Sequence, residues 1–346
     1  MNEETHTPAR EPAVSTSGAT PANPNILTRL RGAIFGVAPV EASFARRGFP
    51  AATPERRRRL ESIGETFLLG YNHAVRTPDF GCLTEALRRV PHAMRGFAYE
   101  GAGMGLAVLD IAAPFRSDAM RRFAAGPGAA HIYMIYVGAG LALARTSPRL
   151  TWRLGALDPL LQGLMWDGYG FHEGFFHPRR AIEARERPRR FGEHKARNFD
   201  QGLGRALWFA TGAAPAAVAE TIGRFPTGRQ ADLWSGIGLA STYAGGVSRA
   251  ELETLRDLSG GHLPHLRQGA SFAAAARARA GNTVPETELA CAVHCGMTPD
   301  RCATIAEDSK PTMDRPDGGE TYTHWRAAIR DVFAGTPRNE TGVNGT

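Results

Sequence analysis

Two histidines and two acids lie close together in the segment 166-WDGYGFHEGFFH-177. Histidine and carboxylate side chains are the usual proton carriers in general acid–base catalysis. His172 and His177 are five positions apart, about 140° around a regular α-helix, so such a helix cannot point both at one metal ion. Glu173 and His177 are four positions apart and can meet on one face. The segment therefore predicts acid–base work by His172 or Glu173, with buried structural polar residues as the alternative and no metal ligand.

The first five residues of that segment recur twice elsewhere in the chain. Tyr99–Gly103, Trp166–Gly170 and Trp234–Gly238 share the order aromatic, acid or serine, glycine, any residue, glycine. The first glycines of the three copies are 67 and 68 positions apart. Three matches at nearly equal spacing indicate a repeat of about 67 residues.

The acid that precedes the first glycine is the second chemical feature of the repeat. Glu100 and Asp167 occupy equivalent positions, whereas the third copy has Ser235, with Asp232 three residues earlier. If the units surround one centre, these carboxylates converge as an acid–base pair. The alternative is that each acid caps a helix or pairs with an arginine such as Arg95 or Arg205.

The candidate site combines these acids with the residues beside them. In the middle copy, His172 and Glu173 replace the small or apolar residues of the other two copies. The candidates for catalysis are therefore Glu100, Asp167, His172 and Glu173. The candidates for substrate contact are Tyr99, Trp166, Tyr169, His177, Asp232 and Trp234.

The elements that must position these residues are predicted to be helices throughout. Apolar residues recur every three to four positions in 79–91 and 213–226, and no segment alternates with a period of two. Each glycine in a helix costs about 1 kcal/mol relative to alanine, so the repeated pair implies close helix approach or a bend. Nucleotide binding is disfavoured, because the spacing is not G-x-G-x-x-G and no strand precedes it.

The predicted fold is all-α, with three related units of about 67 residues and a C-terminal helical extension. The units occupy residues 25–250 and the extension occupies 251–334. Residues 1–24 and 335–346 are polar and predict a disordered arm and a disordered tail.

Three of the four cysteines lie in the extension, in 287-TELACAVHCGMTPDRCATIAED-308. Gly296 is placed to end one helix and Thr298 to cap the next, which predicts a helical hairpin. Cys291 and Cys295 then lie one turn apart and Cys302 lies on the partner helix. Core packing explains this arrangement better than zinc, because the C-x2-C spacing is missing.

The bulk composition describes an ordinary globular chain with a net charge of +7, and 42% of its residues are hydrophobic. The basic segment 178–197 lacks the interleaved aromatics of a single-strand binding groove, so nucleic acid is disfavoured as a partner. The longest apolar run, 129–144, is too short for a membrane span, and no signal peptide opens the chain. We expect a cytoplasmic protein without membrane partners or cofactors.

Several long motifs together resemble a known family. The segments 99-YEGAGMGLAVLD-110, 131-HIYMIYVGAGLALAR-145, 165-MWDGYGFHEGFFH-177, 199-FDQGLGRALWF-209 and 232-DLWSGIGLASTYAGG-246 are similar to an actinobacterial family, domain of unknown function 1702. The resemblance covers about residues 27–333. Members of that family are associated with gene sets for enediyne polyketides, next to the iterative polyketide synthase.

What the resemblance implies is a pathway rather than a reaction. We expect an accessory protein of enediyne antibiotic biosynthesis that acts on the polyene or enediyne-core precursor, as a cofactor-independent isomerase, lyase-type enzyme or cyclase. The alternative is a non-catalytic helical-repeat protein that holds the unstable product or docks the polyketide synthase with other pathway proteins.

Overall fold

Helices account for the regular structure of the chain. The computed structural model describes residues 26–50, 53–77, 79–311 and 319–335. Within these ranges it contains helices and no strand, which confirms the predicted all-α class. The predicted arm 1–24 lies outside the described residues, and so does the tail 335–346 apart from Gly335.

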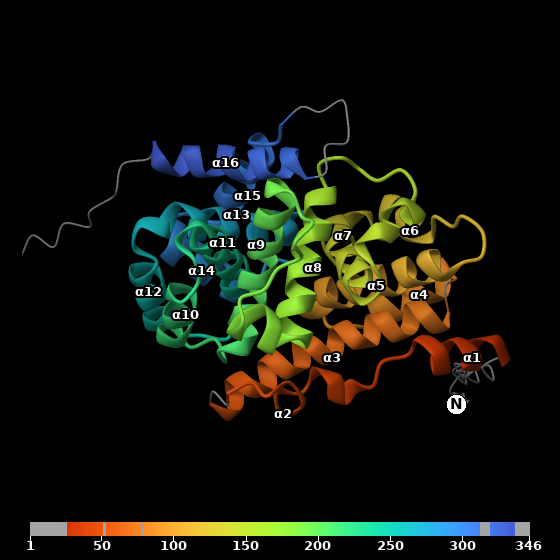
Figure 1. Ribbon diagram of the computed structural model, residues 1–346. Helices are drawn as coiled ribbons and strands as arrows, with labels where there is room; N and C mark the ends of the chain where they lie inside the picture. The colour runs from red at the N-terminus through yellow and green to blue at the C-terminus, as the bar shows by residue number, and fades with distance from the viewer. Residues whose placement is uncertain (1–25, 51–52, 78, 312–318, 336–346) are drawn as a thin grey trace, which may run out of the picture.

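Seven longer helices form the body of the molecule (Figure 1). They are α3 (Pro54–Arg76), α5 (Arg95–Ala112), α7 (Ile132–Arg145), α8 (Gln162–Phe176), α9 (Glu193–Ala210), α11 (Thr227–Tyr243) and α13 (Leu263–Arg279). Each one packs against the next along the chain. Shorter helices join several of them, namely α4 (Phe80–Arg88), α6 (Ala119–Ala125), α10 (Pro215–Gly223) and α12 (Arg249–Leu258).

The repeated glycines are helical and hold neighbouring helices close together. A Cβ atom added to Gly202 of α9 would lie 1.7 Å from the backbone oxygen of Asp167 on α8. Reciprocally, a Cβ added to Gly170 of α8 would lie 1.9 Å from the backbone oxygen of Phe199 on α9. Only glycine permits such an approach, so of the predicted explanations the structure supports close helix packing.

The glycine pair is more frequent than the sequence pattern indicated. It occurs in five successive helices, at Gly101 and Gly103, Gly138 and Gly140, Gly168 and Gly170, Gly202 and Gly204, and Gly236 and Gly238. Each interval of about 67 residues therefore contains two long helices with the same packing device.

Successive long helices run in the same general direction. Along α8 and α9, Gly170 faces Phe199 and Leu203, and Gly174 faces Leu203 and Ala206, so the residue numbers rise together. The row also curves back on itself. The Arg59 side chain of α3 donates a hydrogen bond of 2.9 Å to the backbone oxygen of Ala244, which follows α11. The long helices are therefore arranged around a common centre.

The C-terminal part contains the predicted helical hairpin. α14 (Pro285–Cys295) ends at Gly296, which has a φ of 67°, and Thr298 caps α15 (Pro299–Asp308) by accepting from the backbone N–H of Arg301. Cys291, Cys295 and Cys302 are buried free thiols. α16 (Glu320–Ala334) lies across one end of the long helices (Figure 1).

No single helix among the described residues is both long enough and apolar enough to cross a bilayer. The segments Ala119–Ala125 and Ala129–Arg145 meet both requirements only when taken together, and the chain bends by 98° between them.

Candidate functional site

One face of each long helix points to the centre, and the residue before the first glycine marks that face. Residues four and eight positions further on lie on the same side of an α-helix. The resulting rows are Asp167, Phe171 and Phe175 on α8, Gln201, Arg205 and Phe209 on α9, and Ser235, Leu239 and Tyr243 on α11. Six of these nine residues line a central cavity, whereas Asp167, Gln201 and Ser235 form hydrogen bonds behind Arg205.

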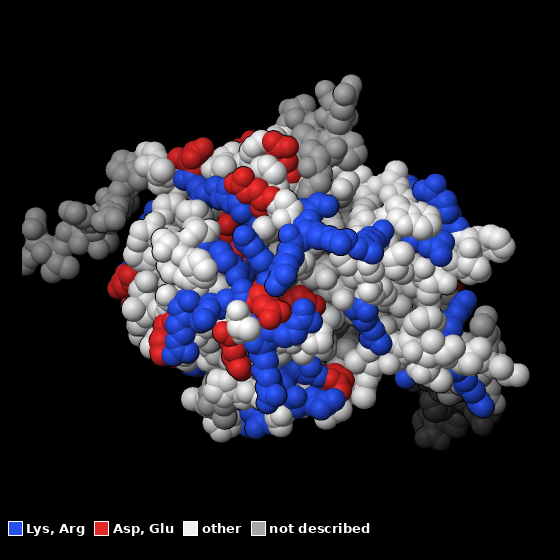
Figure 2. Space-filling view, in the orientation of Figure 1, with Lys and Arg blue, Asp and Glu red and all other residues white. Residues whose placement is uncertain are grey.

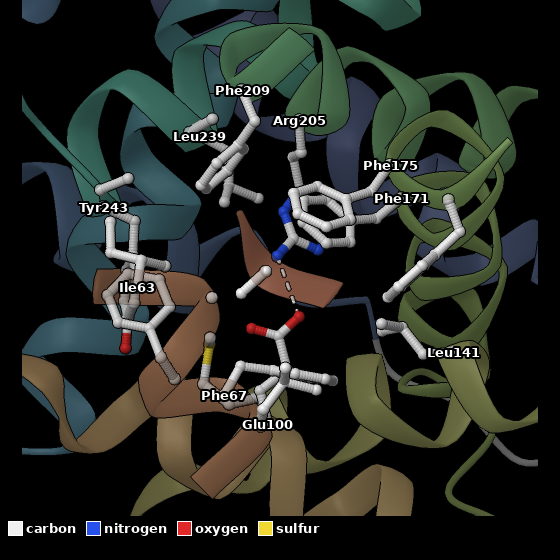
Figure 3. Close-up of a pocket in the computed structure, with 18 of the residues that line it drawn as sticks. Ile63, Phe67, Glu100, Leu141, Phe171, Phe175, Arg205, Phe209, Leu239 and Tyr243 are labelled. Carbon is white, nitrogen blue, oxygen red and sulfur yellow. Dashed lines mark hydrogen bonds and ion pairs between the residues drawn. The ribbon is translucent and has the colours of Figure 1, made fainter. Parts of the chain in front are cut away.

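The central cavity is lined almost entirely by hydrocarbon, and its empty space of about 690 Å³ includes solvent outside its mouth. Helices α3, α5, α7, α8, α9 and α11 all contribute to its wall, as Figure 3 shows. A second apolar lobe of about 460 Å³ adjoins it and shares Met134, Arg205, Leu239 and Tyr243 with it. The two lobes form an elongated chamber whose middle is marked by Arg205.

An ion pair crosses this hydrocarbon chamber. Nη2 of Arg205 donates to Oε1 of Glu100 at 3.2 Å, and the two side chains point toward one another in Figure 3. Nη1 of Arg205 donates to Oδ1 of Asp167 at 2.5 Å. The exposed fractions are 3% for Glu100, 0% for Asp167 and 7% for Arg205. Two carboxylates therefore share one guanidinium away from water, which is the arginine pairing that the sequence offered as the alternative, and the acid–base role stays a prediction.

Burial and the ion pairs shift the pKa values of Glu100 and Arg205 in opposite directions. Desolvation raises the pKa of Glu100 above its ordinary value, although Arg205 opposes the shift. Burial also opposes the charge of Arg205, but Asp167 and Glu100 outweigh burial and raise the pKa of the guanidinium. Among the described residues, the one recorded hydrogen bond to the Glu100 side chain comes from Arg205. Glu100 is therefore a carboxyl group of raised pKa beside an apolar chamber, the environment of an enzymatic acid or base.

Asp167, unlike Glu100, has both carboxylate oxygens bound by other side chains. Its second oxygen accepts a hydrogen bond of 2.7 Å from Nε2 of Gln201, so both oxygens are occupied. The Gln201 amide oxygen accepts from Ser235, whose hydroxyl lies 2.7 Å from the Gln268 oxygen. Asp167 thus anchors Arg205 to a buried polar network and does not line the chamber.

Asp232 does not join the other two acids. It accepts a hydrogen bond of 2.6 Å from Arg326 of α16 and one of 3.3 Å from Arg197. Asp232 precedes Ser235 by three positions on α11, and the residue equivalent to Glu100 and Asp167 is Ser235 itself. Asp232 therefore forms a structural ion-pair cluster that joins α9, α11 and α16. This position does not support the prediction that Asp232 contacts substrate.

The predicted aromatic lining is wrong for both lobes, since none of Tyr99, Trp166, Tyr169 and Trp234 is part of their walls. Tyr99 stacks on His131 with ring centres 4.1 Å apart, and Trp166 packs against Phe191 at 5.2 Å. Tyr169 also packs against Phe191, at 5.4 Å. Tyr99, Trp166 and Trp234 each come one position before the residue that marks the central face, and one residue rotates an α-helix by about 100°.

The true lining could have been found from a different signal. Phe171 and Phe175 follow Asp167 at four and eight positions, and Arg205 and Phe209 follow Gln201 in the same way. The other aromatic residues of the wall are Phe67, Phe97, Phe176 and Tyr243. A search at helical spacing from the residue before the first glycine identifies Phe171, Phe175, Phe209 and Tyr243, whereas a search among the immediate neighbours of the acids identifies none of the seven.

His172, Glu173 and His177 form a separate cluster. α8 ends at Phe176, and His177 has φ and ψ of −128° and 50°, so it leaves the helix. The rings of His172 and His177 are 5.7 Å apart, and Nδ1 of His172 lies 3.3 Å from Oε1 of Glu173. The expected 140° separation of the two histidines held for a regular helix through His177, and this condition is not met because α8 ends one residue earlier. Burial lowers the pKa of His172, although the adjacent Glu173 opposes the shift.

This cluster borders a wider and more polar pocket, which we call the vestibule. The vestibule measures about 1,130 Å³ including its opening. His172, His177, Arg47 and Arg145 line it, and it shares Phe67, Leu68, Glu41 and Phe176 with the central cavity. The vestibule is therefore a neighbour of the central cavity, separated from it by these shared side chains.

Basic residues gather on one face of the molecule, over α8, α9 and their connection (Figure 2). Acidic residues are interspersed among them, and several arginines are paired. Arg229 binds Asp200 with two nitrogens, and Arg187 lies 3.5 Å from the same carboxylate. Part of this positive charge is thus neutralised within the chain. That nucleic acid is not a partner stays a prediction.

Comparison with known proteins identifies a family. A family model described as "Protein of unknown function (DUF1702)" matches residues 26–333. The comparisons with curated proteins and with solved structures found no match.

Proposed function

Since the chain belongs to the DUF1702 family, we propose that it is an accessory enzyme of enediyne biosynthesis that acts on a linear polyene precursor. The observation that carries the proposal is Glu100, a carboxyl group of raised pKa beside an elongated hydrocarbon chamber. A long apolar chain matches such a chamber in shape and polarity. The free cysteines are the ground for proposing a cytoplasmic location.

The proposed chemistry is proton transfer between carbon atoms of the conjugated chain. The Glu100 carboxylate removes a proton from one carbon and returns it to another, so that double bonds shift and no atom is gained or lost. Arg205 holds the carboxylate in place and carries the positive charge beside it. The hydrocarbon wall excludes water, which would otherwise quench the reactive intermediate. This isomerisation, or a cyclisation that follows it, needs no cofactor.

Gene replacement tests the pathway and the residue together. In a producing strain, we expect deletion of the gene to abolish the mature core and to accumulate uncyclised polyene. Wild type and Glu85→Gln should restore production, because Glu85 is an exposed carboxylate on α4. Glu100→Gln should restore less than about one hundredth of it, the usual scale for loss of a general base. Full yield after deletion would disprove the pathway assignment, and rescue by Glu100→Gln would favour the binding or scaffold alternative.

The pH dependence gives an independent test of Glu100. Its base form is the carboxylate, and burial raises its pKa. We therefore expect the rate of polyene isomerisation, followed by absorbance, to fall as the pH decreases through this raised pKa. The loss should begin at a higher pH than for an ordinary carboxyl group, whose pKa is about 4.3. A rate that stays constant down to the pH of acid unfolding would contradict the role of Glu100.

A further inference from the structure

The end of α8 brings three potential metal ligands together at the vestibule. His172 and Glu173 lie near the C-terminal end of α8, and His177 follows the helix, which ends at Phe176. One ligand atom from each side chain lies within 4.8 Å of the other two. Among the described residues, no other group of three or more histidine, cysteine, aspartate or glutamate side chains is close enough to hold one ion.

Two imidazoles and one carboxylate are a recurrent ligand set for catalytic metals. The same set binds Zn²⁺ in hydrolases and Fe²⁺ in non-haem enzymes, and in both it leaves positions open for water or substrate. Metal bonds of about 2.0–2.2 Å place neighbouring ligand atoms roughly 3–3.5 Å apart. The cluster therefore has to contract by about 1.5 Å, which rotation of the half-buried Glu173 and the exposed His177 side chains can provide.

We propose that His172, Glu173 and His177 bind one divalent transition-metal ion, Zn²⁺ or Fe²⁺, with open coordination positions directed into the vestibule. His172 and His177 both line the vestibule, so a group bound to the metal would lie in the space next to the central cavity. Arg145 lines the same space and has no recorded carboxylate partner among the described residues. Its guanidinium lies over the Tyr71 ring at 5.6 Å. An anionic group on the metal would therefore have a second cationic contact.

This site is distinct from the Glu100 cluster and does not depend on it. Glu100 and Arg205 line the central cavity and not the vestibule. The proton transfer proposed for Glu100 could fail experimentally while the metal site is present, and the reverse also holds. Metal content and polyene production therefore report on the two proposals separately.

Metal binding by tag-free, full-length protein tests the site. After chelator treatment, the protein is titrated calorimetrically with Zn²⁺ in air and with Fe²⁺ under anaerobic conditions, and Co²⁺ absorbance reports the ligand geometry. We expect one equivalent of Zn²⁺ or Fe²⁺ to bind to wild type and to Glu100→Gln. His177→Ala and Glu173→Gln should weaken binding at least about a hundredfold, as the loss of a ligand does.

The matched control is His324→Ala, because the His324 side chain is 63% exposed and outside the cluster. It should bind metal as wild type does, and circular dichroism should show the same helix content for all variants. The proposal is overturned if wild type binds neither ion stoichiometrically. It is equally overturned if His177→Ala, folded by circular dichroism, binds either ion as tightly as wild type.

Discussion

Replacing Arg205 with methionine is expected to destabilise the protein by about 3–5 kcal/mol at pH 8, the range for breaking a buried ion pair by removing one partner. The substitution leaves Glu100 and Asp167 buried without their shared guanidinium. Asp167 keeps one hydrogen bond from Gln201, whereas Glu100 keeps no recorded partner among the described residues. The uncompensated carboxylates, rather than the lost volume, account for the effect.

The stability loss in Arg205→Met should depend on pH, because the buried carboxyl groups can take up protons. In the variant, Arg205 no longer opposes burial and the repulsion from Asp167, so the pKa of Glu100 in the folded state rises further above its value in the unfolded chain. A raised pKa favours folding below the unfolded value of about 4 and penalises it as the pH rises. The difference in unfolding free energy between variant and wild type should therefore be smaller at pH 5 than at pH 8. Denaturant unfolding at the two pH values measures this difference.

Two further variants isolate the cause. Arg89→Met removes an arginine whose side chain is 78% exposed and should change stability by less than about 0.5 kcal/mol. Adding Glu100→Gln and Asp167→Asn to Arg205→Met should recover most of the lost stability, because no buried charge then remains. An Arg205→Met protein as stable as wild type at pH 8 would show that the cluster carries no such charge.

Replacing Gly202 with alanine is expected to destabilise the protein by at least about 3 kcal/mol, or to prevent folding. Its Cβ would lie 1.7 Å from the backbone oxygen of Asp167, and a backbone atom cannot move aside without separating α8 from α9. Overpacking of a core by one or two methylene groups already costs about 1–3 kcal/mol. Separation of α8 from α9 would also displace Asp167 from Arg205, so the loss extends to the ion pair.

The matched control is Gly228→Ala. Gly228 belongs to the first turn of α11, and an added Cβ meets no atom within 4 Å. Alanine should therefore stabilise α11 by up to about 1 kcal/mol. Thermal or denaturant unfolding of the two variants distinguishes helix propensity from helix contact. Equal stability of Gly202→Ala and wild type would mean that α8 and α9 are not in close contact at this glycine.

Sequence patterns predicted the helical class and the C-terminal hairpin, but identified only alternate copies of the glycine pair. In α7 the residue before Gly138 is Val137, so the copy has no acid to match. In α9 the acid is Asp200, two positions before Gly202, and Gln201 takes the central position. Backbone contact requires only the glycines, and the flanking residues are free to differ.

The candidate site was predicted in part, for a related reason. Glu100 and Asp167 were identified because their position relative to the glycines fixes the helix face on which they lie. The aromatic neighbours were assigned to the same face without allowing for the rotation of about 100° per residue. The position of His177 depends on where α8 ends, and the sequence signal for that boundary was Pro178, which disfavours a helical conformation at the residue before it.

The central claim is that the chamber around Glu100 and Arg205 binds an elongated apolar molecule. Titration with cis-parinaric acid, a conjugated tetraene whose fluorescence increases in apolar surroundings, tests this claim most directly. Leu239→Trp places a larger side chain where the two lobes meet, and Leu258→Trp adds the same bulk at a position that is 45% exposed. We predict saturable binding of about one equivalent by wild type and Leu258→Trp, with at least tenfold weaker binding by Leu239→Trp. Equal binding by all three proteins, or no binding by wild type, would contradict the claim.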